Sequence, residues 1–310
     1  MKIGSFCSGY GGLDLAVEQF YSAKTSWFSE IYKPAIDLMS SHFGAKPFTD
    51  VTKTNPHDYD EVDIVTAGFP CQPFSTAGYR KGLEDDRAIF EYIGDAIRIL
   101  RPGTVVLENV SGILTLGGTS VVATLTEMGY DSRWGIVRAS DVGAPHQRAR
   151  WFCVATDTSS ERHGGRQDCG VVGELDNGEA GAAQQRQRSR EEFVYRGSSV
   201  ANTTGTERRS TQHEHLGTST RPTTESRECV SETSWGQYRS AITRWENTLG
   251  RTAPKPVDEG KLNPWFVEWM MGLPHGWVCN SGMKRNILLK LLGNGVVPQQ
   301  GHHAIKVLTQ

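Results

Sequence analysis

The chain has 310 residues and a mass of 34.2 kDa, enough to bury the core of one large domain with a smaller one beside it. Its formal net charge is −2 and its isoelectric point is about 6.5, so it lacks an overall basic signature of nucleic-acid binding, and any such surface has to come from a local cluster. The six cysteines include no C-x-x-C pair, no signal-peptide pattern is present and no apolar run reaches membrane-spanning length, which disfavours zinc-binding, disulfide-stapled, secreted and membrane proteins and predicts a cytoplasmic one.

Strands and helices alternate through the first half of the chain. Strands are predicted at residues 2–6, 27–29, near 50, and at 63–67, 104–107, 132–137 and 151–155. Helices are predicted at residues 13–20, 34–42, 87–100 and 120–128. Strands separated by helices of this length form parallel βαβ units, so an α/β fold with a doubly wound, mostly parallel sheet is expected.

The composition changes after Ala155. Residues 156 to about 232 are rich in Gly, Ser, Thr, Arg, Gln and Glu and show no sustained period, which predicts disorder or an extended surface loop in the free protein. Order is expected to return at Trp235. Residues 262–277 are predicted to form a packed helix and turn, and residues 287–292 lead into the segment 293–298 and a closing helix.

Cys71 follows the predicted strand 63–67, which Gly68 and Pro70 bring to an end. In open α/β sheets this edge is where ligands bind. Pro70 and Pro73 restrict the backbone on both sides of the thiol, and a thiol presented in this way is a candidate nucleophile. The alternative is a buried structural cysteine beside a proline-rich turn.

A glycine-rich turn, Phe6-x-x-Gly9-x-Gly11-Gly12, stands between the first strand and the first helix. Glycines there allow a ligand to approach the backbone at a helix N-terminus, although such turns serve many cofactors and some serve none. Glu30, at the end of the next strand, is where a Rossmann-like fold places an acid on a ribose diol. A solvated loop acid is the alternative for Glu30.

Five motifs follow one another along the chain: Phe6 to Gly12, Pro70 to Gln72, Glu108 to Val110, His146 to Arg150, and Gly293 to Val297. In this order and spacing they resemble the DNA (cytosine-5)-methyltransferase family of prokaryotic and phage type, over about residues 1–155 and 260–305. The resemblance implies the Rossmann-like fold of S-adenosylmethionine-dependent methyltransferases with a smaller, irregular target-recognition domain. The expected organisation is a catalytic domain at 1–155, a variable recognition region at 156–260 that is partly disordered when free, and a segment at 261–310 that supports this region and returns to the catalytic domain.

The resemblance assigns Cys71, Glu108, Arg148 and Arg150 to catalysis. Cytosine C5 is a poor nucleophile, and addition of the Cys71 thiolate at C6 makes it a good one. A carboxyl group at Glu108 would protonate or hydrogen-bond the base at N3. Arg148 and Arg150 lie two apart at the start of a predicted strand, so both are expected on one face near the base and the thiolate. An ordinary strand-end acid and a surface salt-bridge ladder are the alternatives.

The same resemblance implies S-adenosylmethionine as cofactor. Phe6, Gly9, Gly11 and Gly12 are expected around its methionine part, Glu30 on its ribose, Ile31, Asp50 and Pro70 around its adenosine, and Asn294 where the pocket closes. Cys7 is expected to be a small packing residue.

Two positions depart from the family's pattern. His146 stands where many members have glutamine, and Trp265 stands where the motif that supports the recognition domain commonly has an arginine. Both changes concern bracing of the backbone and of the recognition domain.

The expected activity is transfer of a methyl group to C5 of a flipped-out cytosine in a short double-stranded DNA sequence, through a Cys71–C6 adduct. A monomer acting on DNA is expected, without a membrane and without a metal, and a separately acting restriction endonuclease is left open as a partner. The alternatives are a transfer-RNA cytosine-5 methyltransferase, which shares the motifs, and a catalytically silent DNA-binding paralogue. An unrelated doubly wound oxidoreductase would leave the Cys71 and Glu108 motifs without a role.

Overall fold

The computed structural model describes residues 1–70, 89–158 and 235–310. The chain divides into two compact units, and every described element belongs to the unit formed by Met1–His163 and Glu232–Gln310. Cys71 and most of the polar region that begins at residue 156 lie outside the described residues.

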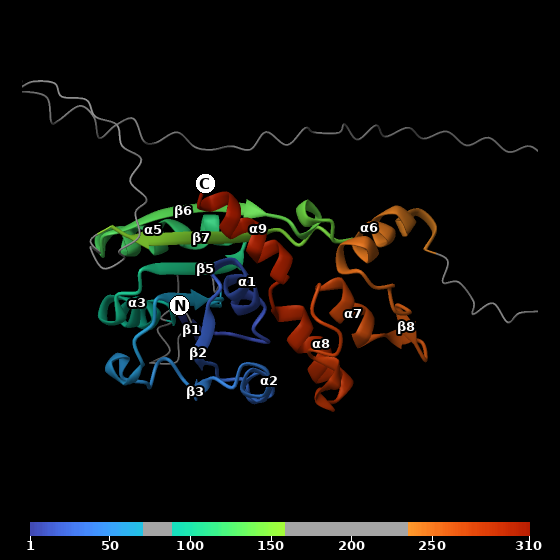
Figure 1. Cartoon of the computed structure of the whole chain (residues 1–310), viewed down its shortest axis with the longest axis horizontal. Coiled ribbons are helices and arrows are strands. Elements are labelled where there is room, and N and C mark those ends of the chain that lie inside the picture. Colours follow the sequence, from blue (N-terminus) through green and yellow to red (C-terminus); the bar gives the residue numbers. More distant parts are fainter. Residues whose placement is uncertain (71–88, 159–234) are drawn as a thin grey trace, which may run out of the picture. The chain divides into compact units, whose positions relative to one another are not determined.

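A seven-stranded sheet organises the described part of this unit (Figure 1). Its strands are β1 (Lys2–Phe6), β2 (Lys24–Ser29), β3 (Lys46–Phe48), β4 (Ile64–Ala67), β5 (Thr104–Val110), β6 (Tyr130–Val137) and β7 (Arg150–Asp157). Their order is β3-β2-β1-β4-β5-β7-β6. The direction of winding reverses between β1 and β4, and the crevice at such a switch point is where doubly wound sheets bind ligands.

Strands β1 to β5 are parallel, whereas β7 is antiparallel to both β5 and β6. Only a short 3-10 helix, η3 (Ala139–Val142), lies between β6 and β7. Without a crossover helix these two strands pair antiparallel. The predicted doubly wound, mostly parallel sheet is thus confirmed.

Helices cover both faces of the sheet. They are α1 (Gly12–Tyr21), α2 (Lys33–Phe43), α3 (Ile89–Leu100), α4 (Ile113–Leu116), α5 (Gly118–Glu127) and α9 (Pro298–Leu308). On one face α1 runs beside α9, and Val17 and Ile305 pack with Val106 of β5 (Figure 1). On the other face, Ile93 of α3 and Leu125 of α5 pack in one apolar cluster with Val105 of β5.

A further 3-10 helix, η1 (Pro56–Asp58), contacts α3. The elements between β7 and α9 lie around a second apolar cluster beside the carboxyl ends of the strands. They are η4 (Gly236–Tyr238), α6 (Arg239–Leu249), β8 (Val257–Asp258), β9 (Lys261–Leu262), α7 (Pro264–Met270), η5 (Cys279–Ser281) and α8 (Arg285–Asn294). Trp245 of α6 and Trp269 of α7 are fully buried there together with Tyr10 and Ala139 of the sheet domain. Residues 235–249 are therefore packed against the segment that follows them.

A buried acid shapes the turn after α7. The Glu268 side chain, 1% exposed, accepts hydrogen bonds from the backbone N–H groups of Gly276, Val278 and Cys279 at 2.7 to 2.8 Å. Hydrogen bonds from backbone donors offset the cost of removing a carboxylate from water. In the described ranges of the chain, no helix is long and apolar enough to cross a membrane.

Candidate active site and glycine turn

The turn between β1 and α1 adopts a conformation that requires its glycines. Gly9 and Gly11 have φ angles of 57° and 82°, in the left-handed region that a side chain disfavours. Gly12 begins α1 so close to the C-terminal segment that a Cβ there would overlap the carbonyl oxygen of Val296. The glycine pattern is explained by local backbone geometry and by this close approach.

Tyr10 lies between these glycines, and it contacts Trp277, Gly295 and Val296 from the C-terminal part of the chain. Its hydroxyl donates to the carbonyl oxygen of Val296 at 2.7 Å, and its ring occupies the space where a Cβ on Gly295 would be. The indole N–H of Trp277 donates to its carbonyl oxygen at 2.9 Å, while the Trp277 ring stacks on His42 with ring centroids 3.8 Å apart. Residues 267 and 286 positions later in the chain therefore fix this turn.

Gly295→Ala is expected to destabilise the fold, because the new Cβ overlaps a fully buried ring. Overpacking of this kind costs about 1–3 kcal/mol of unfolding free energy. Gly293→Ala is the matched control, since nothing lies within 4 Å of its Cβ position and its φ is ordinary. Thermal and urea unfolding should show a loss for Gly295→Ala alone; equal stability of the two variants would contradict the packing described for Tyr10.

Glu30 anchors the glycine turn to the end of β2. Its Oε2 accepts the Gly9 N–H at 2.9 Å, and its Oε1 accepts the N–H groups of Ile31 and Tyr32 at 2.9 and 2.8 Å. Three backbone donors on one carboxylate are more than a solvated loop acid would hold, so that alternative does not apply. One of the four acceptor positions of the carboxylate is left for a further donor.

Glu108 forms a buried ion pair at the carboxyl end of β5. It is 8% exposed, and its Oε1 lies 3.0 Å from Nε of Arg150, the first residue of β7. Burial raises the pKa of the Glu108 carboxyl to about 7, against the opposing effect of the Arg150 and Arg148 guanidiniums. Because its pKa lies near neutrality, this carboxyl can hold or give up a proton under ordinary conditions.

The expectation that Arg148 shares a strand face with Arg150 is wrong. β7 begins at Arg150, and Arg148 precedes it with a φ of 35°, so the two-residue alternation of a strand does not apply. The Arg148 guanidinium instead donates to the carbonyl oxygens of Gly293 and Gly295, at 3.0 and 2.5 Å. It still lowers the pKa of Glu108, so both arginines act on this carboxyl, and they do not form a surface salt-bridge ladder.

The chain just before Cys71 is fixed beside Glu108. Gly68 lies at the end of β4, and its Cβ position is 3.6 Å from Glu108 Oε2. Asn109, the residue after Glu108, donates from Nδ2 to the carbonyl oxygen of Phe69 at 2.9 Å. Cys71 itself lies outside the described residues, and Pro70, which is exposed, is the last residue before the gap.

A small hollow at the strand ends brings together four of the predicted residues, Phe6, Gly9, Glu108 and Asn294. The Phe6 ring is fully buried, with its centroid 5.1 Å from that of Trp27. Asn294 is the last residue of α8. The hollow therefore joins the first motif, the β5 carboxyl and the last motif.

The other predicted cofactor residues lie outside this hollow. Ile31 is 74% exposed beside Glu30. The Asp50 carboxylate accepts from Thr52 and pairs with Lys53 at 3.0 Å. Burial and the nearby Glu30 carboxylate raise the pKa of the Cys7 thiol to about 12, which makes Cys7 a poor source of thiolate.

Sequence reasoning missed one more residue of this region besides Tyr10 and Trp277. Asp14, in the first turn of α1, is fully buried and accepts the Thr66 hydroxyl at 2.6 Å, and burial raises its pKa to about 6. His146, which the sequence marked at a bracing position, lies 3.0 Å through its ring Nε2 from the carbonyl oxygen of Met270, the last residue of α7. For Asp14 the only signal was an acid among apolar helix positions.

The fold and this site define a Rossmann-like α/β protein with a glycine turn at the switch point and a buried carboxyl–guanidinium pair beside it. A model of the C-5 cytosine-specific DNA methylase family matches residues 1–310, and the chain belongs to this family. The family resemblance read from the five motifs is thereby confirmed.

Several curated relatives, including the two that follow, carry the name type II methyltransferase. M1.ScrFI of Lactococcus lactis subsp. cremoris is 37% identical over 164 residues, covering 51% of this chain and 42% of the relative. M.HhaI of Haemophilus parahaemolyticus is 35% identical over 152 residues, covering 47% of this chain and 46% of the relative. The matched stretch thus spans under half the length of these relatives.

Two solved structures align with the chain along its length. A triple mutant of DNMT2 from Spodoptera frugiperda has a TM-score of 0.61 and 15% identity, covering 100% of this chain and 99% of that one. Dnmt2 methyltransferase of S. pombe has a TM-score of 0.61 and 16% identity, covering 99% and 98%. At these identities the likeness concerns the fold.

Proposed function

We propose that this protein transfers a methyl group from S-adenosylmethionine to C5 of a cytosine in double-stranded DNA. The observation that carries the proposal is the buried Glu108–Arg150 pair, 3.0 Å apart, next to the strand end that leads into Cys71. Family membership and the type II methyltransferase relatives support the same activity.

Cys71 would add as a thiolate to C6 of the base, so that the ring electrons move to C5. Glu108 would place a proton at N3 during this addition, and Arg150 would hold the Glu108 carboxyl and face the cytosine carbonyl. S-adenosylmethionine, when bound, would supply the electrophilic methyl group for C5, with S-adenosylhomocysteine as the leaving group. Loss of the C5 proton to a base and return of the N3 proton to Glu108 would then allow the Cys71–C6 bond to break, which restores the aromatic ring, the thiolate and the protonated carboxyl.

The residues present fit that cofactor. The Glu30 carboxylate retains an acceptor position for a ribose hydroxyl, and Ile31 beside it offers an exposed apolar surface for an adenine ring, with Asp50 and Pro70 completing the adenosine side. The backbones of Phe6, Gly9, Gly11 and Gly12 would receive the methionine part, and Asn294 would close the hollow.

Glu30→Gln is expected to weaken cofactor affinity more than turnover at saturating cofactor. A glutamine amide turns a donor toward one of the three backbone N–H groups that the carboxylate now accepts, which loosens the glycine turn. Glu61→Gln, at an exposed position, is the control. Cofactor titration followed by fluorescence or calorimetry measures the effect, and an unchanged dissociation constant would remove Glu30 from the site.

DNA is favoured over transfer RNA as the substrate by the family's description, C-5 cytosine-specific DNA methylase, and by the long region between β7 and α7. We infer that residues 1–155 catalyse, that 156–260 read the target sequence after the base is flipped out, and that 261–310 support this reader. A monomer would suffice to close around one base, and a restriction endonuclease would act separately, in a cytoplasmic setting.

The deciding experiment incubates the protein with S-adenosylmethionine and unmethylated duplex DNA and maps 5-methylcytosine at each base, with transfer RNA in parallel. Methylation at one short recurrent DNA sequence is the expected outcome. Methylation of RNA alone would replace the proposal by its alternative, and no transfer to either would point to a silent paralogue.

A further inference from the structure

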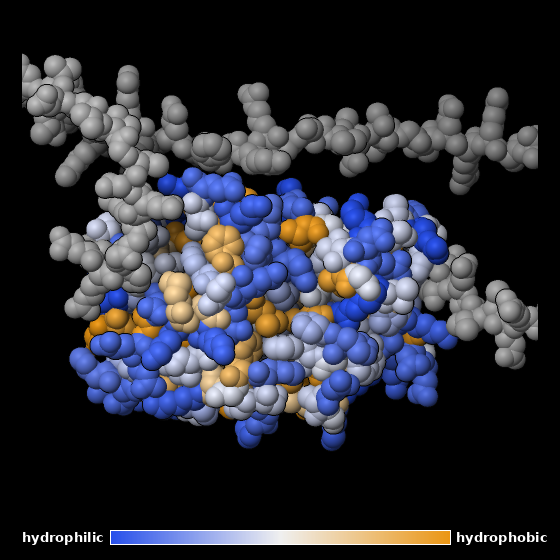
Figure 2. Space-filling model, viewed as in Figure 1, coloured by the Kyte–Doolittle hydropathy of each residue, from blue (hydrophilic) through white to orange (hydrophobic). Residues whose placement is uncertain are grey.

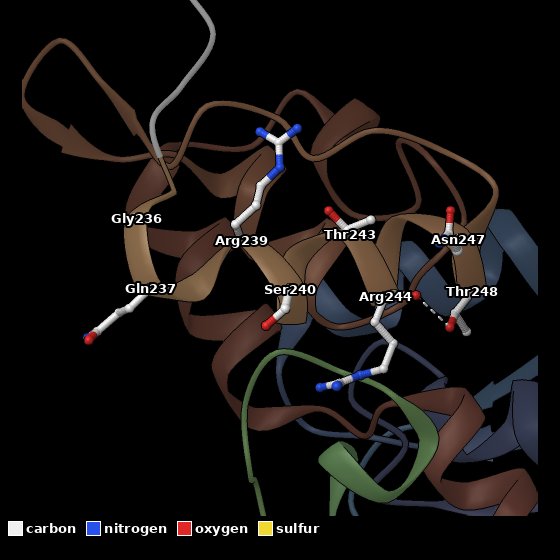
Figure 3. Close-up of a pocket in the computed structure, with 8 residues that line it drawn as sticks. All are labelled: Gly236, Gln237, Arg239, Ser240, Thr243, Arg244, Asn247 and Thr248. Atoms are coloured by element: carbon white, nitrogen blue, oxygen red, sulfur yellow. Dashed lines mark hydrogen bonds between the residues drawn. The ribbon is translucent and has the colours of Figure 1, made fainter.

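One face of α6 presents hydrogen-bond donors and two guanidiniums to solvent. Eight exposed residues from η4 and α6 line an open hollow there (Figure 3): Gly236, Gln237, Arg239, Ser240, Thr243, Arg244, Asn247 and Thr248. We refer to them as the α6 polar face. The surface over α6 in Figure 2 is coloured blue and white, as expected for such residues.

The side chains of the α6 polar face form two rows along the helix. Arg239, Thr243 and Asn247 make one row at spacings of four residues, and Ser240, Arg244 and Thr248 make the other (Figure 3). Successive members of a row lie one helical turn, about 5.4 Å, apart. Each row therefore combines one guanidinium with neutral hydroxyl or amide groups, a donor set that suits the phosphate oxygens of a nucleic acid.

No acid neutralises these arginines within the described part of the chain. None of the eight residues is acidic, and neither Arg239 nor Arg244 forms an ion pair with a described residue. Glu246 of the same helix is engaged elsewhere, where its carboxylate accepts the Ala253 N–H at 2.9 Å. With a net charge of −2 for the whole chain, this is a local positive surface on a protein without a global one.

The opposite face of α6 ties the helix to the loop that carries the arginine motif. On that face Ile242 and Trp245 are buried in one cluster with Ala139 and Ala144. From the polar face, Arg244 Nε adds a hydrogen bond to the Gly143 carbonyl oxygen at 3.2 Å. The chain from Gly143 to Arg150 is short enough to span at most roughly 25 Å. One turn of DNA is about 34 Å long, so a duplex with its cytosine at Glu108 and Arg150 is long enough to reach α6.

We infer that the α6 polar face binds the phosphate backbone of the DNA substrate, without reading its sequence. The inference rests on the proposed function, and it names the surface that holds the duplex while other residues recognise the target. Arg239 is expected to bind a phosphate group most directly, because its side chain has no partner among the described residues. Arg244 combines two roles, since its Nε is bonded to Gly143 while its terminal nitrogens are left for phosphate.

The test compares Arg239→Gln with Arg98→Gln in DNA-binding titrations over a series of salt concentrations. Arg98 is a matched control: an exposed helical arginine in the last turn of α3, just before β5 begins, whose exposed ion pair with Asp95 contributes little. Loss of one phosphate contact reduces the slope of log affinity against log salt by about 0.9. Arg239→Gln should show this reduction equally on target and non-target duplexes, with S-adenosylmethionine affinity and melting temperature unchanged.

Asn247→Asp is a second variant, nearly identical in shape, that brings a negative charge to the other end of the same row. It should weaken binding to both duplexes as well. Wild-type slopes for both variants, or loss on the target duplex alone, would overturn the inference while DNA methylation by the wild type still stands. Absence of DNA binding and methylation in the wild type would instead refute the proposed function.

Discussion

Cys71→Ser is expected to abolish methyl transfer while leaving cofactor binding close to that of the wild type. A serine hydroxyl is a far weaker nucleophile than a thiolate, and it would not add to C6, so C5 would never become reactive. The structure strengthens the expectation because the chain leading to residue 71 is fixed beside Glu108, through Gly68 and the Asn109–Phe69 hydrogen bond. Transfer of labelled methyl groups to duplex DNA measures the loss.

A trapping experiment separates the nucleophile from a merely structural cysteine. A duplex with fluorine at C5 of the target cytosine should form a lasting adduct with the wild type, because fluorine cannot leave as a proton does. Cys71→Ser should form none, and Cys279→Ser, a half-buried thiol of η5 outside the site, should behave like the wild type. Retained turnover in Cys71→Ser would refute the covalent route.

Glu108→Gln is expected to lower turnover on the order of 10²–10⁴-fold, the range for loss of a general acid. The wild-type carboxyl, with a pKa raised to about 7 by burial, is protonated below that pH and loses its proton above it. The kcat/KM of the wild type should therefore fall above about pH 7 with this group, whereas the glutamine variant should lack that limb. The thiolate of Cys71 acts in the opposite direction, so the wild-type profile should be bell-shaped.

Glu127→Gln, at an exposed position at the end of α5, serves as the control for a lost carboxylate. Melting temperatures should accompany the rates, because Glu108→Gln leaves the Arg150 guanidinium without its ion-pair partner. A variant that folds normally, turns over like the wild type and keeps the alkaline limb would show that another group protonates the base.

Local patterns in the sequence predicted most of the fold. The buried strand β4 and the glycine turn before α1 each follow from a pattern of neighbouring residues in the sequence. Their position at the switch point of the sheet follows from the alternation of strands and helices. Glu108 was found because a motif marks it, although the sequence alone did not reveal its ion pair with Arg150. The antiparallel pairing of β7 with β5 brings Arg150 beside Glu108.

Long-range contacts account for what the sequence did not predict. The two-residue spacing of Arg148 and Arg150 indicated a shared strand face, but the backbone of Arg148 turns out of the strand to reach Gly293 and Gly295. The anchoring of Tyr10 by Trp277 and Val296 joins residues 267 and 286 positions apart, which no local pattern encodes.

The anchoring of Tyr10 has a consequence for how the protein folds. Closing loops of this length adds only slowly to the entropic cost, in proportion to the logarithm of loop length, so the closed turn is thermodynamically accessible. Its effect is on rate, because contacts between distant residues raise contact order and slow folding. The glycine turn is therefore expected to reach its final conformation late in folding, after α9 has packed beside α1. A nascent chain that stops before Trp277 should form strands and helices but should not bind the cofactor.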